Sequence, residues 1–242
     1  MNLRNRISLR FMRRLTATPA GRAHMLSQVA DAEGSDEAAI FDRALSRVDD
    51  PHLRKLVEKH KADEERHERL FRARLAATNI TPPPVPDELK LIHRLDAATG
   101  GFLGKPIVDG VGVMQAYALL QVIEERAISQ FALMEQAFRP VDPESADTFA
   151  AVARDEERHL KYCEAIGRRY APDEATRVST VRRFRRIEEE AFQANGAANL
   201  RYVFARGYIV ASPIARFAWR LLGALQRLAL SLRPSSSLPA TA

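Results

Sequence analysis

The chain has 242 residues, of which 46% are hydrophobic and 28% charged, and its formal net charge at pH 7 is +6. These values are ordinary for a globular protein and exclude a largely disordered chain. The single cysteine, Cys163, excludes a disulfide framework, a zinc site built from several cysteines and an iron–sulfur cluster held by several thiolates. This cysteine content permits a cytoplasmic location, which we expect for the chain.

Residues 1–17 are predicted to form a basic amphipathic segment, because arginines such as Arg6 and Arg10 alternate with apolar residues such as Ile7 and Phe11. The same arginines interrupt every apolar run, so the segment does not resemble a secretory signal peptide. Much of the excess positive charge lies here and near the C-terminus. Because the charge is concentrated at the two ends, we expect no nucleic-acid partner.

The remainder of the chain is predicted to be all-α, since apolar residues recur three and four positions apart and no alternating run indicates a strand. Asp50-Pro51 and Asp142-Pro143 each offer an Asp N-cap followed by a proline at the first helical position. The predicted helices span residues 18–48, 51–77, 112–138, 143–170, 172–194 and 199–231.

A long connection over residues 81–110 separates the second and third predicted helices, and residues 86–99 within it are predicted to form a short helix. The other connections are short. Two helical hairpins joined by one long crossover form the arrangement of ferritin-like four-helix bundles. We therefore predict such a bundle over residues 18–170, additional basic amphipathic helices over 171–232, and a disordered tail over 233–242.

The apolar segment from Tyr208 to Leu232 is interrupted by three arginines, so it does not qualify as a transmembrane helix. On a helix, Arg216, Arg220 and Arg227 would gather on one side. One interpretation is peripheral contact with the inner face of an anionic membrane. The alternative is that the segment docks on its own domain or on a second subunit of a homodimer.

The pentapeptide Asp-Glu-Glu-Arg-His occurs twice, at residues 63–67 and 155–159. Sliding the chain by 92 positions superimposes the two motifs, and it also superimposes Pro51 on Pro143. The two hairpins therefore look like copies of one unit. Asp63, Glu65 and Arg66 are predicted to point away from the core. Four motif residues fall on the core-facing apolar rows of their helices: Glu64, His67, Glu156 and His159.

The first and third predicted helices each contribute one further core-facing carboxylate. The apolar row of residues 18–48 passes through Glu33. The row of residues 112–138 passes through Glu124, whereas the 92-residue offset from Glu33 selects Glu125. We favour Glu124, because one insertion or shift in a helix would undo an ungapped offset.

Buried carboxylates and imidazoles are costly unless something compensates their charge. Two divalent cations would balance four carboxylates, and a Glu from each of two helices with Glu-x-x-His from each of two others is the ligand set of di-iron and di-manganese bundles. His60, also on the inward row, is predicted to support the ligands, and Cys163 to pack in the core. Iron is the expected metal and manganese the alternative. The predicted metal ligands are Glu33, Glu64, His67, Glu124, Glu156 and His159.

The paired "DEERH" helices resemble the rubrerythrin and ferritin-like superfamily over roughly residues 20–170. A weaker resemblance is to the demethoxyubiquinone hydroxylase family, in which a Gly-Phe turn precedes a helix with a Glu pair, as "GGFLG" precedes "VIEERAI" here. In that family the first Glu of the pair is a ligand, which implies Glu124. The resemblance also implies a di-iron oxidoreductase that activates O₂ or hydrogen peroxide and acts as a monooxygenase on a quinone or another apolar substrate.

The sequence also departs from these families. "ADAEGSDEAA" surrounds Glu33 where the hydroxylases carry Asp-His-Ala-Gly-Glu-Tyr-Gly, which leaves Glu37 as an alternative ligand. Ser129-Gln130-Phe131 stands in place of their His-His-Tyr, and the four cysteines of a rubredoxin module are absent from the sequence. Two alternatives therefore stay open: a ferroxidase or peroxidase of the rubrerythrin type, and a non-catalytic helical scaffold.

Overall fold

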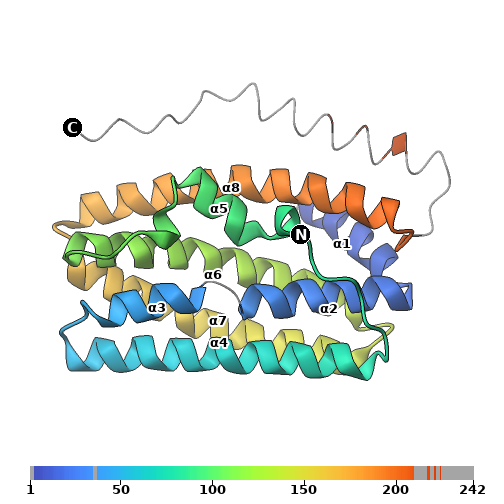
Figure 1. Cartoon of the computed structure of the whole chain (residues 1–242), viewed down its shortest axis with the longest axis horizontal. Coiled ribbons are helices and arrows are strands. Elements are labelled where there is room, and N and C mark those ends of the chain that lie inside the picture. Colours follow the sequence, from blue (N-terminus) through green and yellow to red (C-terminus); the bar gives the residue numbers. More distant parts are fainter. Residues whose placement is uncertain (1–2, 35–36, 210–216, 219–220, 222–223, 225–242) are drawn as a thin grey trace.

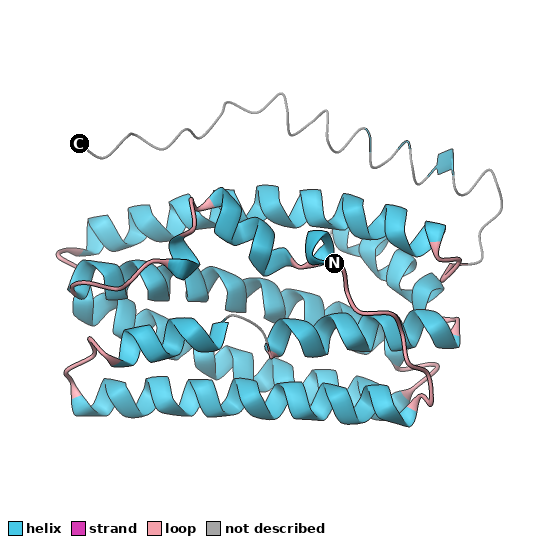
Figure 2. Cartoon of the chain, viewed as in Figure 1, coloured by secondary structure: helices cyan, strands magenta, loops and turns pink. Residues whose placement is uncertain are grey.

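The computed structural model describes residues 3–34 and 37–209, together with residues 217, 218, 221 and 224. These residues form helices joined by loops, and no strand occurs among them, which confirms the all-α prediction (Figures 1 and 2). The helices are α1 Leu3–Thr16, α2 Pro19–Glu33, α3 Glu37–Leu45, α4 Pro51–Ala77, α5 Leu91–Ala98, α6 Gly110–Phe138, α7 Pro143–Tyr170 and α8 Glu174–Ala205, with 3₁₀ turns η1 Asp87–Leu89 and η2 Phe102–Gly104.

The long helices α4, α6 and α7 run side by side, and α2 and α3 follow one another along α4 (Figure 1). α6 packs most extensively on α7, while α4 packs on α2 and α7. α8 lies against the other side of α6, α1 contacts α6 and α2, and α5 contacts α8. The apolar core between these helices is built mostly from their aliphatic and phenylalanine side chains.

The helix predicted over residues 18–48 is interrupted and forms two helices, α2 and α3. Its sequence "GSD" at residues 34–36 contains poor helix formers, and Gly34 follows the last residue of α2. A side chain at Gly34 would collide with the carboxylate of Glu68 on α4, at 2.2 Å from its added Cβ. Because these atoms are the end of a flexible side chain, Glu68 would have to move to accommodate a larger residue here.

Other predicted helix boundaries agree closely with the structure. α4 and α7 span the predicted residues, and their Asp N-caps accept hydrogen bonds from backbone N–H groups of the first turn. α6 begins two residues earlier than predicted, because Asp109 caps it by accepting a bond from Gly112 N at 2.8 Å. The short helix predicted in the crossover is present as η1 and α5.

Two separate helices were predicted over residues 172–194 and 199–231. In the structure one helix, α8, continues through Asn195 and Gly196 to Ala205. A glycine inside a helix costs only about 1 kcal/mol relative to alanine, which packing can offset. Of the segment predicted to contact a membrane or a second subunit, residues 210–232 lie outside the described part of the chain except for four positions, and the tail 233–242 lies wholly outside it.

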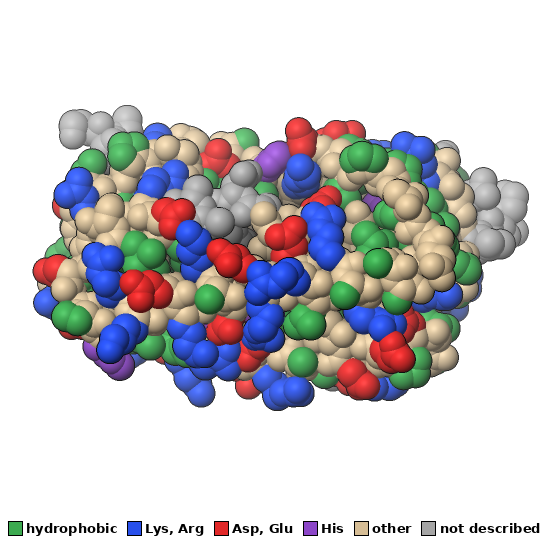
Figure 3. All heavy atoms as spheres, turned by 60° about the horizontal axis from the view of Figure 1, so that its bottom comes forward, with side chains coloured by type: hydrophobic (Ala, Val, Ile, Leu, Met, Phe, Trp, Pro, Cys, Tyr) green, Lys and Arg blue, Asp and Glu red, His purple; other side chains and the backbone are tan. Residues whose placement is uncertain are grey.

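The N-terminal basic segment forms α1, whose Leu9 and Leu15 are buried while Arg6, Arg10 and Arg13 are exposed. In the described residues no helix has the length and apolar character that crossing a membrane requires. On the face shown in Figure 3, Lys and Arg side chains are interspersed with Asp and Glu.

His24 of α2 is a buried histidine outside the motif. Its ring packs against both Tyr202 and Tyr208, with centroid distances of 5.2 and 5.0 Å, and neither ring nitrogen has a hydrogen-bond partner. Burial, aided by the positive charge of Arg206, lowers its pKa from 6.5 to about 4. His24 is therefore neutral in the folded protein at neutral pH.

We expect His24 to make the protein less stable as the pH falls from 6.5 to 4. In this interval the unfolded chain binds a proton that the folded chain excludes, so the free energy of unfolding decreases by up to about 2–3 kcal/mol. The measurement is urea unfolding between pH 4 and 7 for the wild type and His24→Phe, which keeps the aromatic packing. Parallel stability profiles for the two proteins would contradict the assignment.

Candidate metal centre

Seven ionisable side chains from four helices meet in the core. Glu33 is the last residue of α2, and Glu124 lies in the middle of α6. The side chain of Glu33 is 9% exposed, and the three histidine rings have no exposed surface. α4 and α7 contribute the remaining five side chains, so that the full set is Glu33, His60, Glu64, His67, Glu124, Glu156 and His159.

Glu33, Glu64, His67 and Glu156 form one set of converging donors, which we call the Glu33 group. His67 Nδ1 lies 3.2 Å from Glu33 Oε2, 3.2 Å from Glu156 Oε1 and 3.7 Å from Glu64 Oε2. One donor atom from each of the four residues lies within 4.8 Å of all the others, which is close enough to surround one metal ion.

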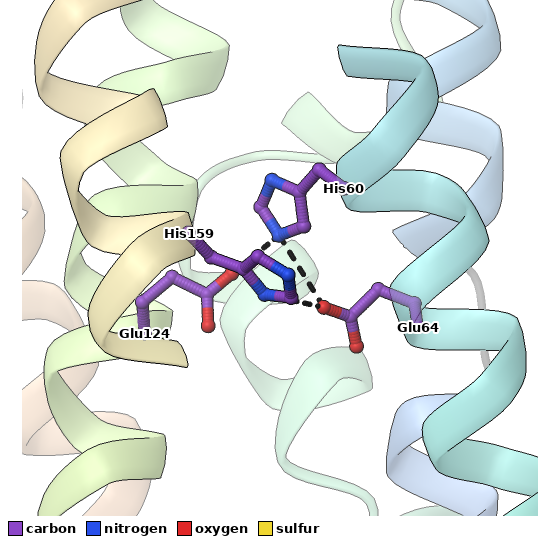
Figure 4. A group of neighbouring side chains, drawn as sticks. All are labelled: His60, Glu64, Glu124 and His159. Carbon is purple, nitrogen blue, oxygen red and sulfur yellow. Dashed lines mark hydrogen bonds and ion pairs between the residues drawn. The ribbon is translucent and has the colours of Figure 1, made fainter. Parts of the chain in front are cut away.

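His60, Glu64, Glu124 and His159 form the second set, which we call the His60 group (Figure 4). His60 Nε2 lies 2.8 Å from Glu124 Oε1 and 3.3 Å from Glu64 Oε1. His159 Nδ1 lies 3.0 Å from Glu64 Oε1, and it also donates to Glu156 Oε2 at 2.6 Å. Glu64 belongs to both groups and so joins them.

The structure brings all six predicted ligand side chains into these two groups. Of the two alternatives in α6, Glu124 lies in the cluster, whereas Glu125 accepts two hydrogen bonds from Arg185 at 2.7 and 2.6 Å. The side chain of the other alternative, Glu37, lies outside the described part of the structure. His60, predicted to support the ligands, is itself among the converging donors.

The carboxylates of the cluster differ in pKa. Burial raises the pKa of Glu33 well above its ordinary value, and the charges of Glu64 and Glu156 add to this effect. For Glu64 burial acts in the same direction, but the close contacts with three histidines outweigh it and bring the pKa well below its ordinary value. Burial and the charge of Glu64 oppose ionisation of Glu156, whose bonds to His159 and His67 nevertheless lower its pKa.

The histidines of the metal-free cluster hold protons. Burial alone would lower the pKa of each ring, but bonds to the neighbouring acidic groups raise the pKa of His67 to about 12 and that of His60 to about 10. The pKa of His159 is raised for the same reason. Imidazolium rings therefore compensate the ionised carboxylates when no cation is bound.

The donor set fits a metal better than a closed salt-bridge network. Glu33 Oε2, Glu64 Oε1 and His67 Nδ1 are buried atoms that have close neighbours of opposite charge but no hydrogen bond of adequate geometry. Buried polar atoms are rarely left unbonded in this way. A cation between the groups would satisfy them, and mixed carboxylate and imidazole donors suit iron and manganese.

Asp63 and Asp155 bind the motif histidines on the ring nitrogen that faces away from the carboxylate cluster. Each aspartate contacts the histidine of the other copy of the motif. Asp63 Oδ2 accepts from His159 Nε2, and Asp155 Oδ2 accepts from His67 Nε2, both at 3.3 Å. With Nε2 engaged, Nδ1 of each ring faces the carboxylate cluster. Metal-binding histidines commonly donate their second ring N–H to a carboxylate in this way.

The prediction that Asp63 and Arg66 point away from the core is wrong for Asp63, which is buried. Arg158 donates to Asp63 at 2.8 Å and pairs with Asp155 at 2.7 Å, while Arg66 pairs with both aspartates. These arginines compensate the two aspartates, whose pKa values are lowered although burial opposes it. Both copies of the motif contain this Asp and this Arg as well as the Glu and the His. That repetition is the sequence signal from which the role of Asp63 could have been predicted.

We expect Asp63→Asn to weaken metal binding by about 10- to 100-fold, because the amide accepts less strongly from His159 and no longer fixes its orientation. Competition with a chromophoric chelator measures the affinity. Glu65→Gln is the matched control, since Glu65 lies two residues after Asp63 in the same helix and is exposed. Equal affinities for the two variants would show that Asp63 does not position His159.

A cavity of about 680 Å³ reaches the cluster from the side covered by α1, α5 and α8. Glu33, Glu64, Glu124 and Glu156 are among the residues that line it, and most of its lining surface is apolar, as at Ile123, Phe131 and Val203. Cavities of this size accommodate small organic molecules. The sequence did not reveal the cavity, because α1 and α8 form its walls from the two ends of the described chain.

Comparison with known proteins gives no relative. No protein-family model matches the sequence, no curated protein matches it, and no solved structure matches the chain. The similarity of the DEERH helices to rubrerythrins and hydroxylases is therefore a resemblance in motif and spacing.

Proposed function

We propose that this protein is a ferritin-like oxidoreductase that uses two iron ions to activate O₂ or hydrogen peroxide. The observation that carries the proposal is the pair of donor groups, which share Glu64 among side chains that are almost wholly buried. Two divalent cations would balance the four carboxylates while the histidines bind as neutral ligands. Iron at these positions would supply the electrons that reduce the oxidant, and manganese is the alternative metal.

The protein's own residues would bind, orient and shield the centre. The six predicted ligands would hold the metals, and Asp63 and Asp155 would fix the orientation of the rings of His159 and His67. Buried side chains around the cluster, such as Phe41 against His60, would limit access of water. These roles require side chains carried by rigid elements. The packed helices α2, α4, α6 and α7 are such elements.

The cavity favours an apolar organic substrate over iron alone. Its apolar walls lead to the carboxylate cluster, so an apolar molecule could bring a carbon atom close to the metals. In a monooxygenase reaction, one oxygen atom of O₂ would enter the substrate and the other would leave as water, with two electrons supplied by a reductant. A quinone is one molecule of this class.

The test combines cavity binding with oxygen transfer. Iron-loaded protein is supplied with ascorbate, a redox mediator and ¹⁸O₂ together with a panel of apolar aromatic and isoprenoid compounds, and products are analysed by mass spectrometry. We expect ¹⁸O in a product and none with Ala127→Trp, which fills the cavity one turn after Glu124. Ala132→Trp, at an exposed position of the same helix, is the control and should retain the reaction.

The other outcomes separate the alternatives. Oxidation of many Fe(II) ions per chain, or turnover of peroxide, that proceeds equally in Ala127→Trp would indicate a ferroxidase or peroxidase. Failure of both proteins to bind metal would indicate a non-catalytic scaffold, in which the imidazolium rings alone compensate the buried carboxylates. Either result would overturn the monooxygenase proposal.

A further inference from the structure

His60 adds a donor that the ligand set of two-metal carboxylate bundles does not contain, since that set has one Glu from each of two helices and Glu-x-x-His from each of the other two. His60 lies one turn before Glu64 in α4. Its ring has no exposed surface, and Nε2 points toward Glu124 and Glu64, at 2.8 and 3.3 Å (Figure 4). This is the direction in which the other donors of the His60 group converge.

The internal repeat shows that the extra donor is present in one copy only. The offset of 92 residues that superimposes the two motifs places His60 on Val152, which is buried one turn before Glu156. An apolar residue therefore occupies the equivalent position of α7. The two halves of the cluster agree in Glu-x-x-His and differ at this position.

The surroundings of His60 fix the orientation of its ring. It stacks on His159 with a centroid distance of 3.9 Å, and Phe41 packs against it at 4.6 Å. The thiol of Cys163, whose pKa burial raises to about 11, lies beside it and stays protonated. A ring held by packing on several sides presents Nε2 to the carboxylates without a further loss of rotamer freedom.

We propose that His60 is a metal ligand and that it makes the two metal positions chemically unequal. The inference rests on the proposed two-metal centre. The Glu33 group offers three carboxylates and one imidazole, whereas the His60 group offers two of each. Nitrogen donors favour later divalent metals such as Co²⁺, and oxygen donors favour Mn²⁺. Cobalt therefore fills the His60 group first, and the two positions load in separate steps.

The test is an anaerobic Co²⁺ titration of the metal-free full chain, followed by calorimetry and by visible absorption. We expect the wild type to bind two Co²⁺ in two resolved steps with different spectra. His60→Val copies the residue of the other repeat, and it should weaken the tighter step by at least about tenfold and make the two spectra alike. Val152→Ala is the matched control, and it should retain both steps.

The outcomes distinguish this inference from the proposed function. If the wild type binds no Co²⁺, the two-metal centre itself fails. If the wild type binds two Co²⁺ and His60→Val binds them with the same affinities and the same spectra as the wild type, the two-metal centre stands and only the proposed role of His60 is wrong. Should His60→Val lose its helical circular dichroism, His60→Ala is titrated with and without free imidazole. Recovery of the tighter step by imidazole supports ligation, and no recovery contradicts it.

Discussion

Glu64→Ala is expected to abolish stoichiometric binding of both metals, with affinity falling by more than about 100-fold. Glu64 is the one residue of the described chain that belongs to both donor groups, so its loss removes a ligand from each position. Removing even a residue that only supports a ligand typically costs 10- to 100-fold, and a shared ligand should cost more.

The helical fold of Glu64→Ala should persist, because the histidines can release their protons once this anionic partner is gone. Bonds to Glu64 contribute to the raised pKa values of His60, His67 and His159, which therefore fall in the variant. Metal content after gel filtration and far-ultraviolet circular dichroism measure the two effects. Glu65→Ala, at the exposed neighbouring position, is the control. Undiminished metal content in Glu64→Ala would contradict the shared role.

Metal binding is expected to release protons and to strengthen as the pH rises. In the metal-free cluster the pKa values of His60 and His67 are raised to about 10 and 12, so both rings are protonated at pH 7, and the pKa values of His159 and Glu33 are raised as well. Metal ligands must be deprotonated, and two metals therefore displace at least about two protons. Raising the pH removes these competitors, and each released proton contributes up to about a tenfold gain in overall affinity per pH unit.

Calorimetric titrations in two buffers of different ionisation enthalpy measure the released protons directly. The observed heat should differ between the buffers by an amount that corresponds to at least about two protons per two metals. Repeating the titrations between pH 6 and 8 should show affinity increasing with pH. Equal heats in the two buffers, with affinity independent of pH, would show that the cluster is not protonated as the structure indicates.

Much of the fold could be predicted from local sequence signals. The Asp-Pro pairs at residues 50–51 and 142–143 mark the starts of α4 and α7, because capping is decided by a few adjacent residues. The interruption after Glu33 and the continuity of α8 through Gly196 were not predicted. The interruption falls at the poor helix formers of residues 34–36, whereas α8 continues because tertiary packing can override the modest helix propensity of one glycine.

The part of the candidate site that depends on helical periodicity could be predicted from the sequence. Spacing places Glu64, His67, Glu156 and His159 on inward rows, and the apolar row of α6 favours Glu124 over Glu125. The positions of His60 and Asp63 follow from distances between helices. Contacts such as that of Asp63 with His159 join residues 96 positions apart, and no local pattern determines them.

The most direct test of the two-metal centre is an anaerobic Fe(II) titration of the metal-free chain, followed by admission of O₂ with the near-ultraviolet and visible absorption recorded. Two Fe(II) ions bound per chain, and both oxidised to Fe(III) with new absorption bands, would support the proposed oxidoreductase. The absence of stoichiometric binding would show that the doubled DEERH motif forms a salt-bridged core without a metal.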